Sequence, residues 1–152
     1  MTTTDELTAV LRSADTEDID AFIEKYRDKM ISDEKPFTAF MRHKLKESGI
    51  KQQDVFLRAD VPEGYGYKLI SGEKRTRSRD VILRLLFASE FPLDDIQRAL
   101  KLCGMAPLYP KIQRDAVLMI AANKGLTDAY DICVLLEEHG MEPLKAVGSI
   151  DD

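Results

Sequence analysis

A run of basic side chains lies near the middle of the chain. Within six residues, the polar stretch after Gly72 places four cations: Lys74, Arg75, Arg77 and Arg79. Cations this close together can neutralise neighbouring phosphates of a polyanion and release the counterions condensed on it. A solvated, arginine-rich turn has the same composition. The elements around the run must therefore decide whether it meets a phosphate backbone.

The charge of the whole chain hides a basic middle. The net charge is −5, which by itself disfavours a nucleic-acid partner. Residues 41–79 carry ten basic and five acidic side chains, whereas residues 1–40 and residues 80–152 each have a net charge of −5. Such an asymmetry is typical of a localised anion-binding surface. Chance clustering of charges on a solvated face is the alternative.

Length and composition indicate an ordinary folded chain. It has 152 residues, of which 44% are hydrophobic and 32% charged, enough for one compact domain or two very small ones. The longest apolar run, residues 116–122, is too short for a membrane helix, and the acidic N-terminus does not resemble a targeting peptide. Two cysteines, Cys103 and Cys133, predict neither a disulfide framework nor structural zinc. We therefore expect a reduced, cytoplasmic protein without a membrane partner.

The elements that position the basic run are all predicted to be helices. Apolar side chains recur at helical spacing, and no segment alternates as a strand does. Prolines such as Pro36 and Pro92 suit helix starts, and glycines such as Gly49, Gly72 and Gly104 suit helix ends. The predicted helices cover residues 3–13, 16–30, 36–48, 52–59, 63–71, 80–89, 92–103, 112–124 and 128–139. The sequence thus predicts an all-α protein of about nine helices.

Two of the helix pairs echo one another. Arg79-Asp80 and Arg114-Asp115 each open an apolar helix, and a second helix ending in Gly-Met follows in both cases. The echo favours a duplicated helical hairpin. Chance similarity between two amphipathic helix pairs is the alternative, and two copies are too few for a solenoid.

The stretch that contains the basic run carries the most informative pattern. Two short helices meet at a tight turn, and the second ends at Gly72 and leads into the basic loop. In the phrases GIKQQDV (49–55) and SGEKR (71–75), the stretch resembles the phage-repressor-like (Xre, or Cro/C1) helix-turn-helix family of bacteria. The resemblance implies a five-helix DNA-binding domain with added helices at both ends. The implied parts are an N-terminal helical extension (1–35), the helix-turn-helix domain (36–104), a C-terminal helical hairpin packed on it (105–145) and a disordered tail (146–152).

The resemblance also implies roles for individual residues. The helix at 63–71 would lie in the major groove of DNA, and the N-terminus of the helix at 52–59 would hold a phosphate. Phosphate contacts are implied for Gln52 and for Lys74, Arg75, Arg77 and Arg79. Base-facing positions are implied for Glu63, Gly64, Lys68 and Ser71. Outside what the resemblance implies, Gln53 and Tyr67 are further candidate DNA contacts, since the ring of Tyr67 or Tyr65 could pack against a sugar or donate to a phosphate. Arg79 has an alternative role, which is to pair with a carboxylate at the start of its own helix.

Three features of the helix at 63–71 depart from the family. Gly64 and Gly66 lie inside it, and each costs about 1 kcal/mol of helix preference relative to alanine. Gly66 stands where the family has a branched apolar residue, and the ring of Tyr65 or Tyr67 is expected to fill the space. Glu63 can accept a hydrogen bond from cytosine N4 but repels phosphate. The helix therefore offers few strong readers of base sequence.

Catalytic and metal-binding patterns are not found in the sequence. His43 and His139 stand far apart, and no nucleophile motif or phosphate-binding loop occurs. We therefore expect a transcriptional regulator with no enzymatic activity, cofactor or metal. It would bind double-stranded DNA as a homodimer that forms through residues 112–141. The alternative is a helical adaptor that keeps the fold but binds a protein partner, with the C-terminal helices as the candidate surface.

Overall fold

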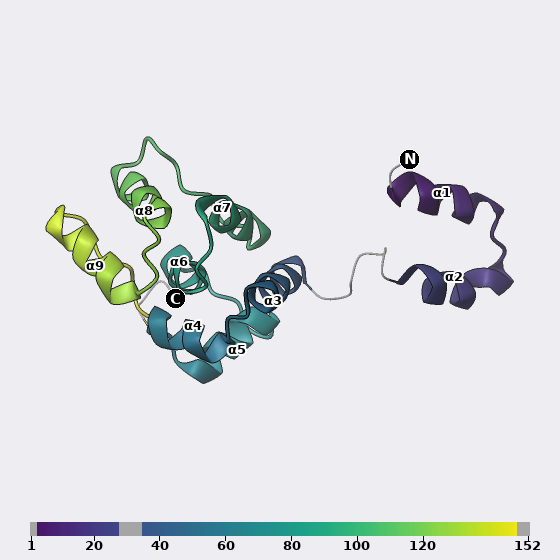
Figure 1. Cartoon of the computed structure of the whole chain (residues 1–152), viewed down its shortest axis with the longest axis horizontal. Helices are drawn as coiled ribbons and strands as arrows, with labels where there is room; N and C mark the ends of the chain where they lie inside the picture. The colour runs from purple at the N-terminus through teal and green to yellow at the C-terminus, as the bar shows by residue number, and fades with distance from the viewer. Residues whose placement is uncertain (1–2, 28–34, 149–152) are drawn as a thin grey trace. The chain divides into compact units, whose positions relative to one another are not determined.

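The computed structural model describes residues 3–27 and 35–148, and it is all-α (Figure 1). Within these ranges the chain forms nine α-helices, one short 3₁₀-helix and no strand. The chain divides into two units, Met1–Asp33 and Glu34–Asp152. In the described ranges, no helix has both the length and the apolar character needed to cross a bilayer.

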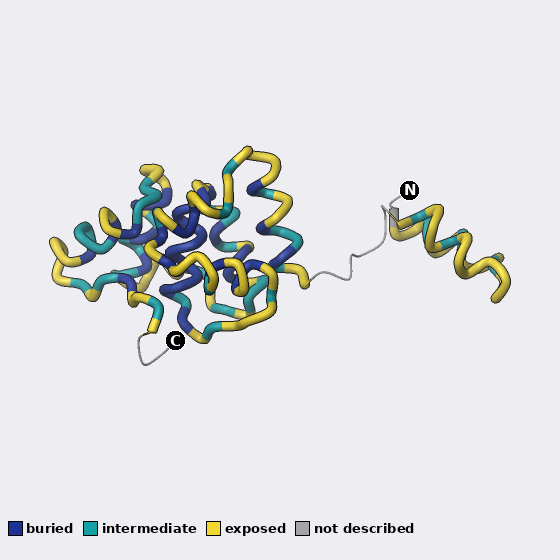
Figure 2. Tube along the Cα trace, turned by 90° about the horizontal axis from the view of Figure 1, so that it is seen from below, coloured by how far each residue is buried: buried dark blue, intermediate teal, exposed yellow. Residues whose placement is uncertain are grey.

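The smaller unit consists of α1 (Thr3–Ser13), the 3₁₀-helix η1 (Thr16–Asp18) and α2 (Ile19–Tyr26). The boundary between the two units, after Asp33, lies two residues before residue 35, where the N-terminal extension was predicted to end. The Asp15 N–H donates to the Asp18 carboxylate at 2.9 Å and fixes the start of η1. No residue from 4 to 27 is fully buried, as the yellow and teal of Figure 2 show. The predicted end of the second helix, near Met30, lies outside the described residues.

The larger unit holds the remaining helices. They are α3 (Pro36–Ser48), α4 (Gln52–Ala59), α5 (Glu63–Ser71), α6 (Arg79–Ala88), α7 (Leu93–Leu102), α8 (Gln113–Asn123) and α9 (Ala129–Glu138). Each lies within two residues of its predicted bounds, because Pro36 and Pro92 stand at helix starts and a glycine follows every helix end in this unit except those of α4 and α6, where Asp60 and Glu90 take the positive-φ position. The prediction of an all-α chain is confirmed.

The core of the larger unit is built around α6. Every residue from Asp80 to Ala88 is buried, and α6 packs against α4, α7 and α9. Figure 2 shows this as the dark blue centre of the unit. Full burial of a leucine or phenylalanine side chain stabilises a fold by about 1.5–3 kcal/mol. The helix that follows the basic loop is therefore the most firmly held element of the fold.

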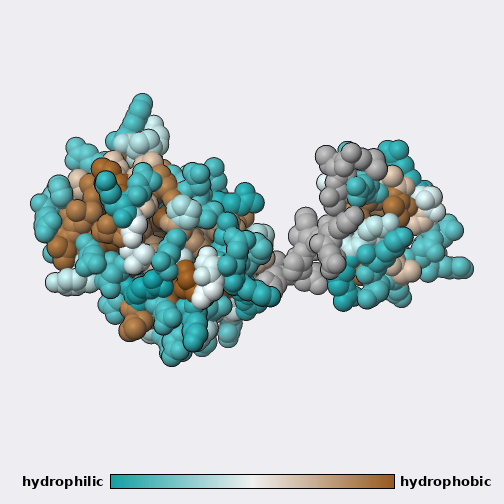
Figure 3. All heavy atoms as spheres, in the orientation of Figure 1, coloured by the Kyte–Doolittle hydropathy of each residue, from teal (hydrophilic) through white to brown (hydrophobic). Residues whose placement is uncertain are grey.

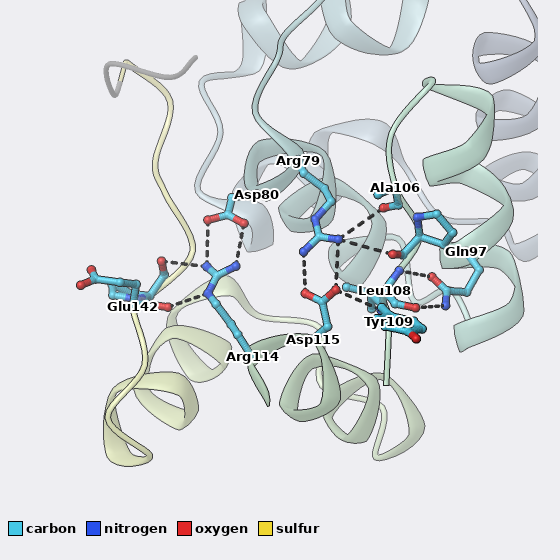
Figure 4. Close-up of polar contacts among 11 residues, drawn as sticks. Arg79, Asp80, Gln97, Ala106, Leu108, Tyr109, Arg114, Asp115 and Glu142 are labelled. Carbon is cyan, nitrogen blue, oxygen red and sulfur yellow. Dashed lines mark hydrogen bonds and ion pairs between the residues drawn. The ribbon is translucent and has the colours of Figure 1, made fainter. Parts of the chain in front are cut away.

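Two Arg-Asp pairs join the start of α6 to the start of α8 (Figure 4). Arg79 forms a two-point ion pair with Asp115 (closest N–O distance 2.5 Å), and Arg114 forms one with Asp80 (2.8 Å). The two repeated dipeptides thus exchange partners. Burial raises the pKa of Asp80, but hydrogen bonds from Arg114 and the Lys145 N–H outweigh it and hold that pKa below its ordinary value.

The C-terminal segment is tied into the same core. The buried guanidinium of Arg84 donates to Ala59 O at 3.1 Å, to Leu144 O at 2.6 Å and to Lys145 O at 2.8 Å. Val147 also packs against the core. Val147 belongs to the tail predicted over residues 146–152, so this part of the predicted tail contacts the core. Residues 149–152 of that prediction lie outside the described residues.

Candidate nucleic-acid interface

Helices α4 and α5 are joined by the turn at residues 60–62. Asp60 adopts a left-handed backbone (φ 53°), and its N–H donates to Leu57 O at 3.2 Å. The next N–H, of Val61, reaches back to Phe56 O at 3.1 Å, and the Val61 side chain is buried. Asp is one of the few residues other than glycine that tolerate this conformation. The chain therefore leaves α4 through a compact cap and enters α5 at Pro62.

Gly66 allows α4 and α5 to approach closely. A Cβ on Gly66 would lie within 2.8 Å of three ring carbons of Phe56, a contact that real Cβ atoms essentially never make. The space beside Gly66, which a tyrosine ring was expected to fill, is therefore filled by the Phe56 ring. Tyr67 instead packs edge-on against Phe56, with the ring centroids 4.8 Å apart. Gly66 weakens α5 as an isolated helix, but it also allows α5 to pack closely against α4.

The predicted base-facing residues share the exposed face of α5. Its buried face consists of Gly66, Leu69 and Ile70. Its exposed positions are Glu63, Gly64, Tyr67, Lys68 and Ser71. A Cβ at Gly64 would meet nothing within 4 Å, so the backbone there is open to a close approach by a ligand. The structure thus brings these five residues together on one helix.

Some polar groups on this face already have partners within the chain. The Ser71 hydroxyl donates to Lys68 O at 3.2 Å and accepts from the Glu73 N–H at 3.3 Å. Desolvation raises the pKa of Tyr67, and the Glu63 carboxylate, which accepts a hydrogen bond from the phenol, raises it further. The phenol and the Glu63 carboxylate are thus paired on this face. The Lys68 amine is the group on this face best suited to a base edge or a phosphate.

The basic loop follows α5 directly. The Lys74 N–H donates to Lys68 O at 3.0 Å and holds the loop against the end of the helix. Lys74, Arg75 and Arg77 are exposed, and no hydrogen bond or ion pair joins the side chain of Arg75 or Arg77 to another described residue. Arg79 differs, since its side chain is only 26% exposed and its guanidinium is held by Asp115. It pairs across to α8, not with the carboxylate of its own helix.

The N-terminus of α4 is open to an anion. Its N-cap residue is Lys51, which supplies no capping side chain, and Lys51 O accepts the N–H groups of Asp54 and Val55. The N–H groups of Gln52 and Gln53 therefore precede the helical ladder. Gln53 is exposed and Gln52 half-buried. This is where the sequence placed a phosphate contact.

Sequence reasoning missed one cation near the loop. The Lys35 amine donates to Gly72 O at 2.6 Å, and its aliphatic chain covers the Gly72 Cα. Lys35 is 37 residues from Gly72 in the sequence, so only the tertiary fold brings it there. In residues 3–27 and 35–148, no cluster of three or more His, Cys, Asp or Glu side chains could hold a metal ion.

Comparison with known proteins found no relative. No family model, no curated protein and no solved structure matches the chain.

Proposed function

We propose that the chain is a DNA-binding transcriptional regulator of the helix-turn-helix class. In this proposal α4 and α5 are the helix-turn-helix, and α5 lies in the major groove. One observation carries it. The exposed face of α5 runs directly into a loop whose cations Arg75 and Arg77 are exposed and make no hydrogen bond or ion pair with another described residue. A helix that reads a groove needs cations beside it to bind the flanking phosphates.

The cations of the basic loop and the exposed residues of α5 have different roles in this proposal. Lys74, Arg75 and Arg77 neutralise phosphates and give affinity that is independent of sequence. Lys68 and the Glu63–Tyr67 pair are the groups offered to base edges, where one good contact discriminates by about 1–3 kcal/mol. Gly64 lets the α5 backbone come close to the DNA because no side chain stands in the way.

We further propose that a second copy of the chain supplies the other half-site. One short recognition helix covers few base pairs, so proteins of this class bind as twofold dimers. The C-terminal helices expose three large side chains, with Ile112 50%, Ile120 57% and Tyr130 74% exposed. Figure 3 shows brown surface over the part of the larger unit where Figure 1 places α8 and α9.

The test is binding to duplex DNA at low salt. Fluorescence anisotropy with a labelled random duplex should show binding at micromolar protein, and selection from a random library should then yield a preferred site. Lys68→Ala should change the preference at one base position. Failure to bind any duplex would contradict the proposal and favour the adaptor.

The adaptor that binds a protein partner remains the second candidate. Leu57, on α4, is 81% exposed, and an exposed leucine suits a protein partner better than it suits DNA. The same anisotropy experiment separates the two candidates.

A further inference from the structure

A pocket opens between the start of α3, the loop after α5 and the end of α7. Its volume is about 330 Å³, the size of a small-molecule site. All of its lining residues belong to the larger unit. Its apolar lining includes Phe37, Leu69, Ile82, Leu102 and Met105. Such a lining suits the hydrocarbon part of a ligand.

The polar lining of the pocket is cationic. Lys35, Lys74 and Arg75 line it, and none of the described lining residues is acidic. This stands out in a chain whose net charge is −5. Burial raises the pKa of the Cys103 thiol to about 12, against the opposing effect of the Arg75 guanidinium, so this lining residue brings no negative charge. The electrostatics of the pocket therefore favour an anion.

An unpartnered hydroxyl lies in the wall of the pocket. Thr38 is 2% exposed, and its Oγ1 makes no hydrogen bond in the described structure. This oxygen is 3.2 Å from the point where a Cβ on Gly72 would stand, and Lys35 Cδ is 2.7 Å from the same point, so the Lys35 side chain lies over the hydroxyl and must turn aside to admit a ligand. A buried hydroxyl without a partner costs about 1–3 kcal/mol. A ligand oxygen placed there would remove that cost.

The first turn of α3 adds backbone donors at the same wall. The helical ladder of α3 begins with the Ala39 N–H, which donates to Lys35 O at 3.0 Å. The N–H groups of Phe37 and Thr38 precede it and stand at the positive end of a 13-residue helix. The Lys35 amine, now on Gly72 O, belongs to an exposed side chain that can turn to a bound anion.

We propose that this pocket binds a small organic anion, a carboxylate or phosphate ester on an apolar body, and that the anion acts as an effector of the basic loop. The Thr38 hydroxyl, the first N–H groups of α3 and the Lys35 amine hold the anionic group, and the apolar lining takes the body. The effector role rests on the proposed function, since Lys74 and Arg75 belong both to the pocket and to the loop offered to DNA. A bound anion engages these two cations and lowers the affinity for DNA.

Binding is tested on the full-length ¹⁵N-labelled chain without DNA. Phenyl phosphate, inorganic phosphate and benzyl alcohol are titrated in turn at low salt while the amide signals of Phe37, Thr38, Lys74 and Arg75 are followed. Phenyl phosphate should shift all four signals. It should bind about tenfold more tightly than inorganic phosphate, because its ring buries apolar surface. Benzyl alcohol, which lacks the charge, should leave the signals in place.

Two variants test the anion contacts. Thr38→Val removes the hydroxyl at constant shape, and Lys35→Gln removes the charge; each should weaken phenyl phosphate binding about tenfold. Thr38→Val also removes the unpartnered buried oxygen, so it is expected to fold at least as well as the parent. Lys124→Gln, the same charge change at an exposed residue outside the pocket, should leave binding unchanged.

Three results would overturn the binding site. They are the absence of shifts at the four amides, equal affinity for inorganic and phenyl phosphate, and parental binding by both variants. The effector role is measured separately, by DNA anisotropy with and without phenyl phosphate at constant ionic strength. Unchanged DNA affinity with the pocket filled would overturn that role. A chain that binds phenyl phosphate here but binds no DNA would keep the pocket and refute the proposed function.

Discussion

Removal of two loop arginines should change how DNA binding depends on salt. Arg75 and Arg77 are the perturbation of choice, because both are exposed and neither has a hydrogen bond or ion pair with a described residue to lose. Arg79 is left in place, since its ion pair with Asp115 makes it part of the fold. The double change Arg75→Ala, Arg77→Ala therefore tests phosphate contact with little effect on folding.

The magnitude follows from counterion release. Each neutralised phosphate contributes about −0.9 to the slope of log K against log salt, so the double variant should lose about 1.8 units of slope per subunit. Between 50 and 200 mM salt, the parent should therefore lose about 12-fold more affinity per subunit than the variant. The loss of affinity at low salt should be the same on a selected site and on random DNA.

The assay is fluorescence anisotropy at four or more salt concentrations. The control is Arg98→Ala, Lys101→Ala, which removes the same charge from exposed positions of α7 and should keep the parental slope. A parental slope in the Arg75, Arg77 variant would refute the reasoning, because the loop would then not touch phosphate. An equal change of slope in the control would assign the effect to net charge alone.

Three further predictions test the fold and the dimer. Gly66→Ala should destabilise the chain by about 1–3 kcal/mol, because the new Cβ meets the Phe56 ring, whereas Gly64→Ala, two residues away in open space, should stabilise it by about 0.5–1 kcal/mol. Urea unfolding of both variants measures the difference, and equal effects would contradict the close packing of α5 on α4. Because the pKa of Asp80 is lowered in the folded chain, the contribution of Asp80 to stability is present above the unfolded pKa and is lost as the pH falls through about 4 and below. The urea midpoint should therefore fall less steeply from pH 6 to pH 3 in Asp80→Asn than in the parent, and a parallel fall would contradict this role of Asp80. Ile120→Glu should weaken dimerisation in analytical ultracentrifugation with little effect on the urea midpoint, because the parent side chain is 57% exposed; a variant as dimeric as the parent would place the interface elsewhere.

Sequence reasoning reached the helices because their ends are marked locally. Pro36 at the start of α3 and Gly72 at the end of α5 act through their own backbone preferences, so a single sequence suffices to place them. The exposed face of α5 followed for the same reason, since positions 64, 67, 68 and 71 share one side of any helix.

The rest depends on contacts between residues far apart in the chain. The penalty at Gly66 was visible in the sequence, but the Phe56 ring that makes a glycine necessary there belongs to another helix. The repeated Arg-Asp dipeptides were visible too, yet nothing local shows that they exchange partners. Lys35 and Thr38 gave no signal, because their meeting with Gly72 is a tertiary event.

The buried Arg84 has a consequence for synthesis on the ribosome. Two of the carbonyls that accept its hydrogen bonds, those of Leu144 and Lys145, are made some 60 residues after it. Until they emerge, the central helix carries a guanidinium that cannot be buried without loss of partners. The nascent chain must therefore leave Arg84 without these two partners until residues 144 and 145 have emerged. A product truncated before residue 144 would keep this defect and present it to proteases.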